Sequence, residues 1–304
     1  MRRFHFIFAA LVFSFLFTPV YVFGLSGFTP QLAFVESTDP REDQFRGGFD
    51  VFLSDIDREG VVQLTHEGTN FTPAWSSDGK FIAFTSDRTG RLELFLMRPG
   101  GGFLQPLGVE GRNPSWSPDG RYLAYDRVML GREKVFVYDL VNEKEMFLAF
   151  GNHPSWSPDG ERIALTGAIY EFDPVHGSRF VRGIGEKPSW SPGGDLIALE
   201  AEHQIFLLDL RNDQIRRVTS GGATANFDVS WDADGHLIYR GAEDGTSKLY
   251  VHDVVTGKRR AFLDAEGIVT ARIFGAVSVD YLDPPYATSP QGNFFTTWGG
   301  LKVH

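Results

Sequence analysis

A seven-residue motif centred on tryptophan recurs five times along the chain, and it constrains the fold more than any other feature. Five of the six tryptophans lie in it, spaced 41, 40, 34 and 41 residues apart. A period near 40 residues is typical of repeat proteins, in which each copy is one supersecondary unit. The five copies occupy residues 73–79, 114–120, 154–160, 188–194 and 229–235 and centre on Trp75, Trp116, Trp156, Trp190 and Trp231.

Each copy of the motif has the composition of a strand end followed by a tight turn and a second strand. The third copy is Pro-Ser-Trp-Ser-Pro-Asp-Gly, and the apolar run Arg-Ile-Ala-Leu follows at 162–165. Proline fits the second position of a type I turn, aspartate caps the turn locally, and glycine takes the positive φ that closes a hairpin. The motif therefore predicts a β-hairpin in every copy.

Two further strands recur downstream of each hairpin. The third strand carries an aromatic residue and ends in an aspartate at Asp55, Asp139, Asp209 and Asp253, which we expect to hydrogen-bond the turn that follows. A shorter fourth strand is predicted at 104–107, 146–149, 216–219 and 260–263. Four antiparallel strands in each period of this length are typical of a β-propeller blade.

The first unit is incomplete, and this indicates how the ring closes. Residues 31–34, 51–56 and 61–65 match the second, third and fourth strands, but no first strand precedes them. We therefore predict an all-β fold, a six-bladed β-propeller with four-stranded antiparallel blades that is closed by the C-terminal segment. Residues 269–277 and 289–295 are both candidates for the closing strand, and a seven-bladed ring is the alternative if both are used.

The unit with the 34-residue period is expected to be abnormal. Its third strand is predicted, weakly, at 178–184, and its fourth strand is expected to be absent.

The N-terminus has the pattern of a signal peptide. Arg2 and Arg3 precede an apolar stretch over 6–17, Pro19 ends that stretch, and residues 22–24 offer a cleavage site. We predict a signal peptide at 1–24, a single propeller domain at 25–304, and a periplasmic or secreted location. An uncleaved anchor is the alternative, and only in that case do we expect a membrane contact.

Composition and missing motifs narrow the function classes. The net charge of −10 argues against a nucleic-acid partner, because phosphate binding needs clustered Lys and Arg. The chain has no cysteine, which excludes disulfides, thiolate metal sites and thiol nucleophiles. No Gly-x-Ser-x-Gly elbow of a serine hydrolase occurs, and the histidines fall in different frames of their repeats. We therefore expect no catalysis, no cofactor and no bound metal.

The repeat also resembles a known family. The run Pro-Ser-Trp-Ser-Pro-Asp-Gly-Arg-Tyr-Leu-Ala-Tyr at 114–125, with its downstream aromatic-x-x-Asp strand, is similar to the WD40-like repeat of the TolB family of β-propellers. The resemblance covers nearly all of the chain after residue 24 and implies the propeller fold. The same repeat is similar to the propeller halves of prolyl-oligopeptidase-type peptidases and some pectate-type lyases, so it implies no single activity.

The candidate binding residues stand three and four positions before each tryptophan. The residue one position before is Ala or Ser, small enough for the innermost strands to converge on a central channel. Strand alternation puts the residue three before on the same face, at the channel mouth, where a polar ring suits a loop, a peptide or a sugar. The alternative is that residues entering a strand are polar in any case. The candidates are Thr72, Arg112, Asn113, Asn152, His153, Glu186, Lys187 and Asp228.

These observations predict an exported, monomeric, non-enzymatic propeller that binds a protein or a cell-envelope component through its channel-mouth face. The alternative is a carbohydrate-active enzyme of the lyase type, or a sugar-binding protein, with its site at the same mouth and His153, Lys187 and Asp228 as its polar set.

Overall fold

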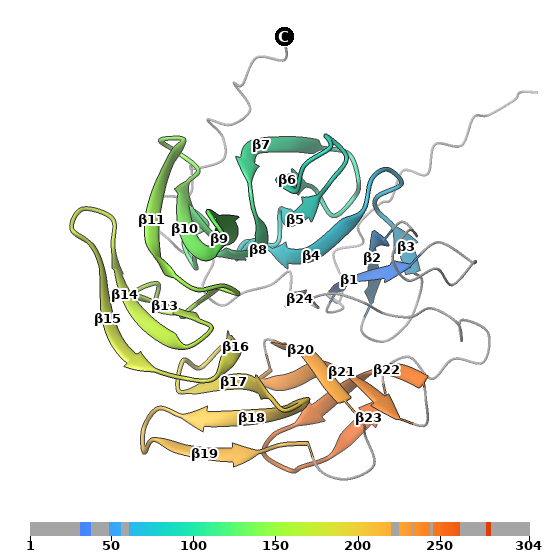
Figure 1. Ribbon diagram of the computed structural model, residues 1–304. Helices are drawn as coiled ribbons and strands as arrows, with labels where there is room; N and C mark the ends of the chain where they lie inside the picture. The colour runs from blue at the N-terminus through green and yellow to red at the C-terminus, as the bar shows by residue number, and fades with distance from the viewer. Residues whose placement is uncertain are drawn as a thin grey trace, which may run out of the picture.

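Each copy of the tryptophan motif forms the hairpin that starts a four-stranded antiparallel sheet, here called a blade. The computed structural model describes residues 31–37, 49–55, 61–219, 225–232, 234–243, 246–261 and 278–280. The blades lie side by side around a common centre (Figure 1). Within the described residues, no helix is long and apolar enough to span a membrane.

Five blades are each built from four consecutive strands, and the strand that carries the tryptophan lies at one edge. The five are β4 (Asn70–Trp75), β5 (Ile82–Ser86), β6 (Glu93–Met97) and β7 (Leu104–Glu110); β8 (Arg112–Trp116), β9 (Tyr122–Met129), β10 (Arg132–Asp139) and β11 (Lys144–Phe150); β12 (Ser155–Trp156), β13 (Arg162–Leu165), β14 (Ala168–Asp173) and β15 (Gly177–Gly183); β16 (Glu186–Trp190), β17 (Leu196–Ala201), β18 (Gln204–Asp209) and β19 (Gln214–Arg217); and β20 (Ala225–Trp231), β21 (His236–Glu243), β22 (Thr246–Asp253) and β23 (Arg259–Ala261).

A further four-stranded sheet combines segments that are far apart in the sequence. It contains β1 (Gln31–Ser37), β2 (Phe49–Asp55), β3 (Val61–Gln63) and β24 (Ser278–Asp280) in the order β24-β1-β2-β3. The first three therefore occupy the second, third and fourth positions, as the sequence predicts. The strand that pairs with β1 is β24, with Gln31 opposite Asp280. In the sequence, β24 comes directly after the first candidate segment, 269–277. Both predicted candidate segments lie outside the described residues.

The β12–β15 blade corrects the prediction for the short repeat. Its third strand is β14, and residues 177–183 form a fourth strand that pairs with it, so the expected loss of the fourth strand is wrong. The strands β13 and β14 are joined by only Thr166 and Gly167, and Gly167 has a φ of 90°. The period is short because the strands are short: β13 has four residues and β14 six, whereas β9 and β10 have eight each, and all four strands are kept.

The Ser-x-Asp-Gly turn is held by its own side chains. In the β4–β5 hairpin, Ser76 Oγ donates to Asp78 Oδ1 at 2.7 Å and accepts the Phe81 N–H at 3.0 Å. Gly79 donates its N–H to the Ser76 carbonyl oxygen at 2.9 Å with a φ of 65°, a conformation that glycine adopts without a steric penalty. The turn residues therefore repeat because each has a structural task.

The repeated tryptophans fill the space between neighbouring blades, as the repeat pattern predicts. Their exposed fractions are only 5–7%. Trp116, for example, packs in one cluster with Phe81 and Leu94 of the preceding blade. Its Nε1 also donates to the Ala74 carbonyl oxygen at 3.0 Å, and Trp231 Nε1 makes the corresponding bond to Ser189 at 3.0 Å. The indoles therefore join each blade to the one before it.

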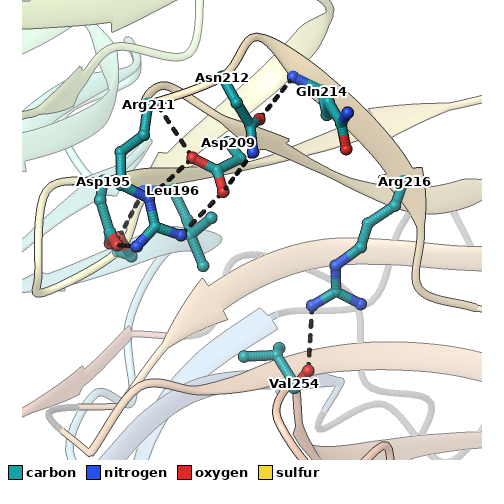
Figure 2. A network of polar contacts seen from close by, with 9 residues as sticks. Asp195, Leu196, Asp209, Arg211, Asn212, Gln214, Arg216 and Val254 are labelled. Atoms are coloured by element: carbon teal, nitrogen blue, oxygen red, sulfur yellow. Dashed lines mark hydrogen bonds and ion pairs between the residues drawn. The ribbon is translucent and has the colours of Figure 1, made fainter.

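The aspartates that end the third strands hold the next turn, as predicted. Asp139, Asp209 and Asp253 each accept the backbone N–H of the residue two positions later, at 2.9–3.0 Å. Figure 2 shows the turn at Asp209, where Arg211 forms ion pairs with Asp209 and Asp195. Nearby, Arg216 donates to the Val254 carbonyl oxygen of the next blade at 3.0 Å. The side chain of Asp55 lies outside the described residues.

Candidate binding site at the channel mouth

The innermost strands β4, β8, β12, β16 and β20 enclose a cavity of about 450 Å³ at the centre of the molecule. The small residues that precede the tryptophans all line it, as the sequence predicts. They are Ala74, Ser115, Ser155, Ser189 and Ser230.

Five of the eight candidate binding residues also line this channel, one from each blade that carries the motif. All five have left-handed backbone, with φ between 41° and 56°. In the blades of β4, β8, β16 and β20 the ladder shifts register at this point, which marks a β-bulge. The five channel-lining residues, here called the rim, are Thr72, Asn113, His153, Lys187 and Asp228.

The bulge corrects the argument that placed the rim. Simple alternation along a strand was expected to put the rim residue and the small residue on one face. The left-handed residue instead interrupts the alternation, and it is this local turn of the backbone that brings the side chain to the channel.

The other three candidates do not line the channel. Arg112 forms ion pairs with Asp126 at 2.7 Å and with Glu133 at 2.5 Å, and Asn152 donates to the same Glu133 carboxylate. Glu186 is exposed at the start of β16. Arg112 and Asn152 therefore belong to a polar cluster beside the mouth, with Glu133 at its centre.

A second polar row was missed by the sequence reasoning. It lies toward the end of the second strand of each tryptophan blade, or directly after it, where an apolar run ends in a polar residue, as in Tyr-Leu-Ala-Tyr-Asp at 122–126 and Leu-Ile-Ala-Leu-Glu at 196–200. This abrupt change from apolar to polar residues is the sequence signal that could have identified the second row. The row consists of Thr85, Asp126, Thr166, Glu200 and Arg240.

Residues of this second row form hydrogen bonds with residues of the rim. Within one blade, Thr72 and Thr85 join their hydroxyl groups at 3.0 Å, and Asn113 Nδ2 donates to Asp126 Oδ1 at 2.7 Å. The row also reaches the next blade, since Asp126 Oδ1 accepts the His153 N–H at 3.0 Å.

The same link recurs in the two blades that follow. Thr166 Oγ1 accepts the Lys187 N–H at 3.2 Å, and Glu200 Oε1 accepts the Asp228 N–H. The backbone of the rim is thus fixed from blade to blade.

Charges on one side of the mouth are paired within the wall. Lys187 Nζ lies 2.9 Å from Glu200 Oε2 and 4.0 Å from Asp228 Oδ1, and Arg240 Nη2 lies 2.9 Å from Asp228 Oδ2. Burial raises the pKa of Glu200, and the attraction of Lys187 opposes that rise. Two cations and two carboxylates therefore form one compact network, which keeps these side chains in place.

His153 is the rim residue with an unused hydrogen-bonding atom. Its Nδ1 is buried and has no hydrogen-bond partner among the described residues. Burial lowers the pKa of His153, Asp126 opposes the effect, and Lys187 and Arg112 add to it. Burial therefore favours the neutral form of the ring at pH 7, and the residue lines the channel.

A group of possible metal ligands lies at the turn between β20 and β21. Asp232, Asp234 and His236 have ligand atoms within 4.8 Å of one another. Asp232 takes the place of the motif serine, and its carboxylate accepts the His236 N–H at 2.7 Å and contacts His236 Nδ1 at 2.8 Å. Hydrogen bonds within the turn account for this arrangement.

The family model of the TolB beta propeller domain matches residues 31–168. This segment covers the strands β1 to β3, two complete tryptophan blades and part of a third. The chain has a TolB-like β-propeller.

Two solved structures support the assignment of this TolB-like propeller at the level of fold. TolB from Acinetobacter baumannii superposes with a TM-score of 0.65 at 20% identity, over 84% of this chain and 67% of that protein. A putative TolB from Agrobacterium tumefaciens gives 0.55 at 15% identity, over 78% and 89%. Such low identities establish shared architecture, and one propeller architecture serves many functions.

One curated protein matches the TolB-like propeller in sequence. An uncharacterized protein of Agrobacterium fabrum is 43% identical over 54 residues, which is 17% of this chain and 18% of that protein. The match spans less than a fifth of either chain.

Proposed function

We propose that this TolB-like propeller is exported and non-enzymatic, and that it binds a protein or another cell-envelope component through its channel-mouth face. The rim is the observation that carries the proposal. Its five side chains, Thr72, Asn113, His153, Lys187 and Asp228, differ in chemistry while the residues around them repeat. Variation inside a regular frame allows a propeller to recognise a partner without disturbing its packing.

The bonding of the rim favours recognition over proton transfer. Lys187 and Asp228 are engaged in ion pairs with Glu200 and Arg240, and the Thr72 hydroxyl is bonded to Thr85. Groups that are held in place in this way present fixed charges and donors to a ligand, which gives specificity at a small cost in entropy.

The proposal includes the organisation of the whole chain. We take residues 1–24 as a signal peptide and 25–304 as one domain, located in the periplasm or secreted as a monomer. We further take the sheet β24-β1-β2-β3 as the sixth blade, closed by the C-terminal segment, which the pairing of Gln31 with Asp280 supports.

Site-specific photo-cross-linking tests the proposed face. The rim residue Lys187 lies near the start of β16, and β17 runs antiparallel to β16, so the β17–β18 turn lies at the mouth. The β14–β15 turn joins the third and fourth strands of its blade and therefore lies at the opposite end. A photoreactive residue at the exposed Glu202 should capture an envelope component, and the same residue at the exposed Val175 should not. Equal capture from both positions, or capture from Val175 alone, would refute the proposal.

A further inference from the structure

The hairpin between β9 and β10 carries an apolar residue where the turn chemistry disfavours one. Met129 pairs with Arg132, so Leu130 and Gly131 form a two-residue loop, with φ values of 53° and 74°. Positive φ at both positions is typical of a type I′ turn, which favours Asn or Gly at the first position. Leu130 is moreover 97% exposed. A leucine at this position is unfavourable both for the backbone and for its side chain.

The corresponding hairpin of another blade shows that the turn does not require an apolar residue. Between β17 and β18, Ala201 pairs with Gln204, and Glu202 and His203 form the loop with φ values of 50° and 60°. Both of these loop residues are polar and exposed. Of these two hairpins only β9–β10 has an apolar tip, which Val128 and Met129, 56% and 36% exposed, extend.

Below the tip lies a collar of exposed aromatic rings and cations. Lys134 pairs with Phe150 across β10 and β11, and Phe147 and Phe150 pack edge to face with centroids 5.6 Å apart. The Arg132 guanidinium and the Lys134 ammonium each lie 5.7 Å from the Phe150 ring centre. Phe147 and Phe150 are 51% and 54% exposed.

The two cations of the collar are available to an anionic partner. Among the described residues, neither Arg132 nor Lys134 forms an ion pair, and the Glu133 between them is paired with Arg112. The chain as a whole is acidic, with a net charge of −10. This collar is therefore a place where a negatively charged surface can approach the protein.

We propose that the β9–β10 hairpin inserts into the surface of an anionic lipid bilayer, with the channel mouth turned toward the membrane. The layers of the hairpin match those of a membrane interface: apolar side chains at the tip, then aromatic rings and cations at the depth of the lipid headgroups. The tip is a narrow convex knob, whereas a stable protein contact needs about 800 Å² from each partner. The inference rests on the proposed envelope role and names the membrane as a component that this face meets.

The absence of cysteine from the chain permits a direct test. An environment-sensitive fluorophore is attached to Met129→Cys in the full chain, or to Val175→Cys at the opposite end as the control. Vesicles of phosphatidylcholine with phosphatidylglycerol are added, with and without quenchers on the acyl chains. The proposal predicts a blue shift and quenching at position 129 but not at 175, and weaker binding in high salt. No quenching at 129, or equal quenching at both positions, would overturn it.

A substitution at the tip separates insertion from folding. Leu130→Asn suits a type I′ turn, so the melting temperature should be unchanged or higher, while the partition of the Met129-labelled protein should fall about tenfold or more. Val175→Asn removes a similarly exposed apolar side chain from the opposite end and should change nothing. An unchanged partition in Leu130→Asn would overturn the proposal.

The vesicle experiment and the cross-linking experiment can fail independently. Capture of a protein from Glu202 without insertion of the hairpin would leave the proposed function standing and refute the membrane inference. Insertion without capture would support the membrane inference and refute a protein partner at this face. Arg132→Glu with Lys134→Glu should abolish the preference for anionic vesicles, and a retained preference would refute the role of the collar.

Discussion

Lys187 and Glu200 form a 2.9 Å ion pair that ties the first strand of a blade to its second strand at the channel mouth. The pair is also linked to the next blade, because Glu200 Oε1 accepts the Asp228 N–H. One largely buried carboxylate therefore orders two rim residues from neighbouring blades.

Loss of this carboxylate should be costly. Glu200→Ala leaves Lys187 without its nearest partner and the Asp228 N–H without an acceptor, so the free energy of unfolding should fall by about 3 kcal/mol. Urea denaturation measures the loss, and Glu202→Ala on the exposed turn is the matched control, expected to have no effect. A Glu200→Ala protein as stable as the control would show that the pair has no structural role.

Acid should weaken the fold through His153. Burial lowers the pKa of this residue below 6.5 in the folded chain, so the folded state binds fewer protons than the unfolded state in the window below 6.5. The contribution of the neutral His153 ring to the free energy of unfolding is complete above pH 6.5 and is lost as the pH falls toward the lowered pKa. Unfolding free energies of the wild type and of His153→Asn between pH 7 and pH 5 should therefore differ in slope, the wild type being steeper. Equal pH slopes for the wild type and His153→Asn would show that the pKa of His153 is not lowered in the folded chain.

Truncation of a repeated tryptophan should damage two blades together. Trp116→Ala removes an indole packed between the β4–β7 and β8–β11 blades and should cost about 3–5 kcal/mol. Trp116→Phe keeps much of the packing but loses the hydrogen bond to the Ala74 carbonyl oxygen. The loss of this bond should lower the free energy of unfolding by about 1 kcal/mol. Chemical denaturation distinguishes the two variants. Equal effects would show that the hydrogen bond, and not the packing, dominates.

Removal of residues 269–304 should expose the edge of β1. That deletion takes away β24, whose pairing covers Gln31 to Ala33, and an open strand edge promotes association between chains. The shortened chain should melt earlier and aggregate, as light scattering would show. A monomeric product with unchanged melting would mean that β24 does not close the ring.

The architecture could be predicted because its signals are local and repeated. The Ser-x-Asp-Gly turn closes three of the hairpins and close variants of it close the other two. The burial of Trp116 and its counterparts identifies the face that meets the neighbouring blade. The prediction for the third strand of the short repeat was wrong because β13 and β14 are shorter than β9 and β10, so this strand ends sooner after the tryptophan than in the other repeats. Residues 178–184 were then assigned one position too early in the blade.

The site was only partly predictable, for physical reasons. The rim was found from its spacing, yet its orientation depends on a left-handed residue such as His153, which alternation along a strand does not reveal. The partners of the rim are far away in sequence. Asp126, for example, meets His153 27 residues later and in another blade, and such a contact becomes visible only in the folded chain.

Calorimetric titration of the component captured from Glu202 measures whether the rim binds it. The variant combines His153→Asn with Lys187→Gln and Glu200→Gln. Asparagine tolerates the left-handed backbone, and the two amides can replace the ion pair by a neutral hydrogen bond. We predict unchanged melting with at least about tenfold weaker binding, while Val175→Asn binds like the wild type. Unaltered affinity in the triple variant, with unchanged melting, would show that the rim does not bind the component and that the binding surface lies elsewhere on the propeller.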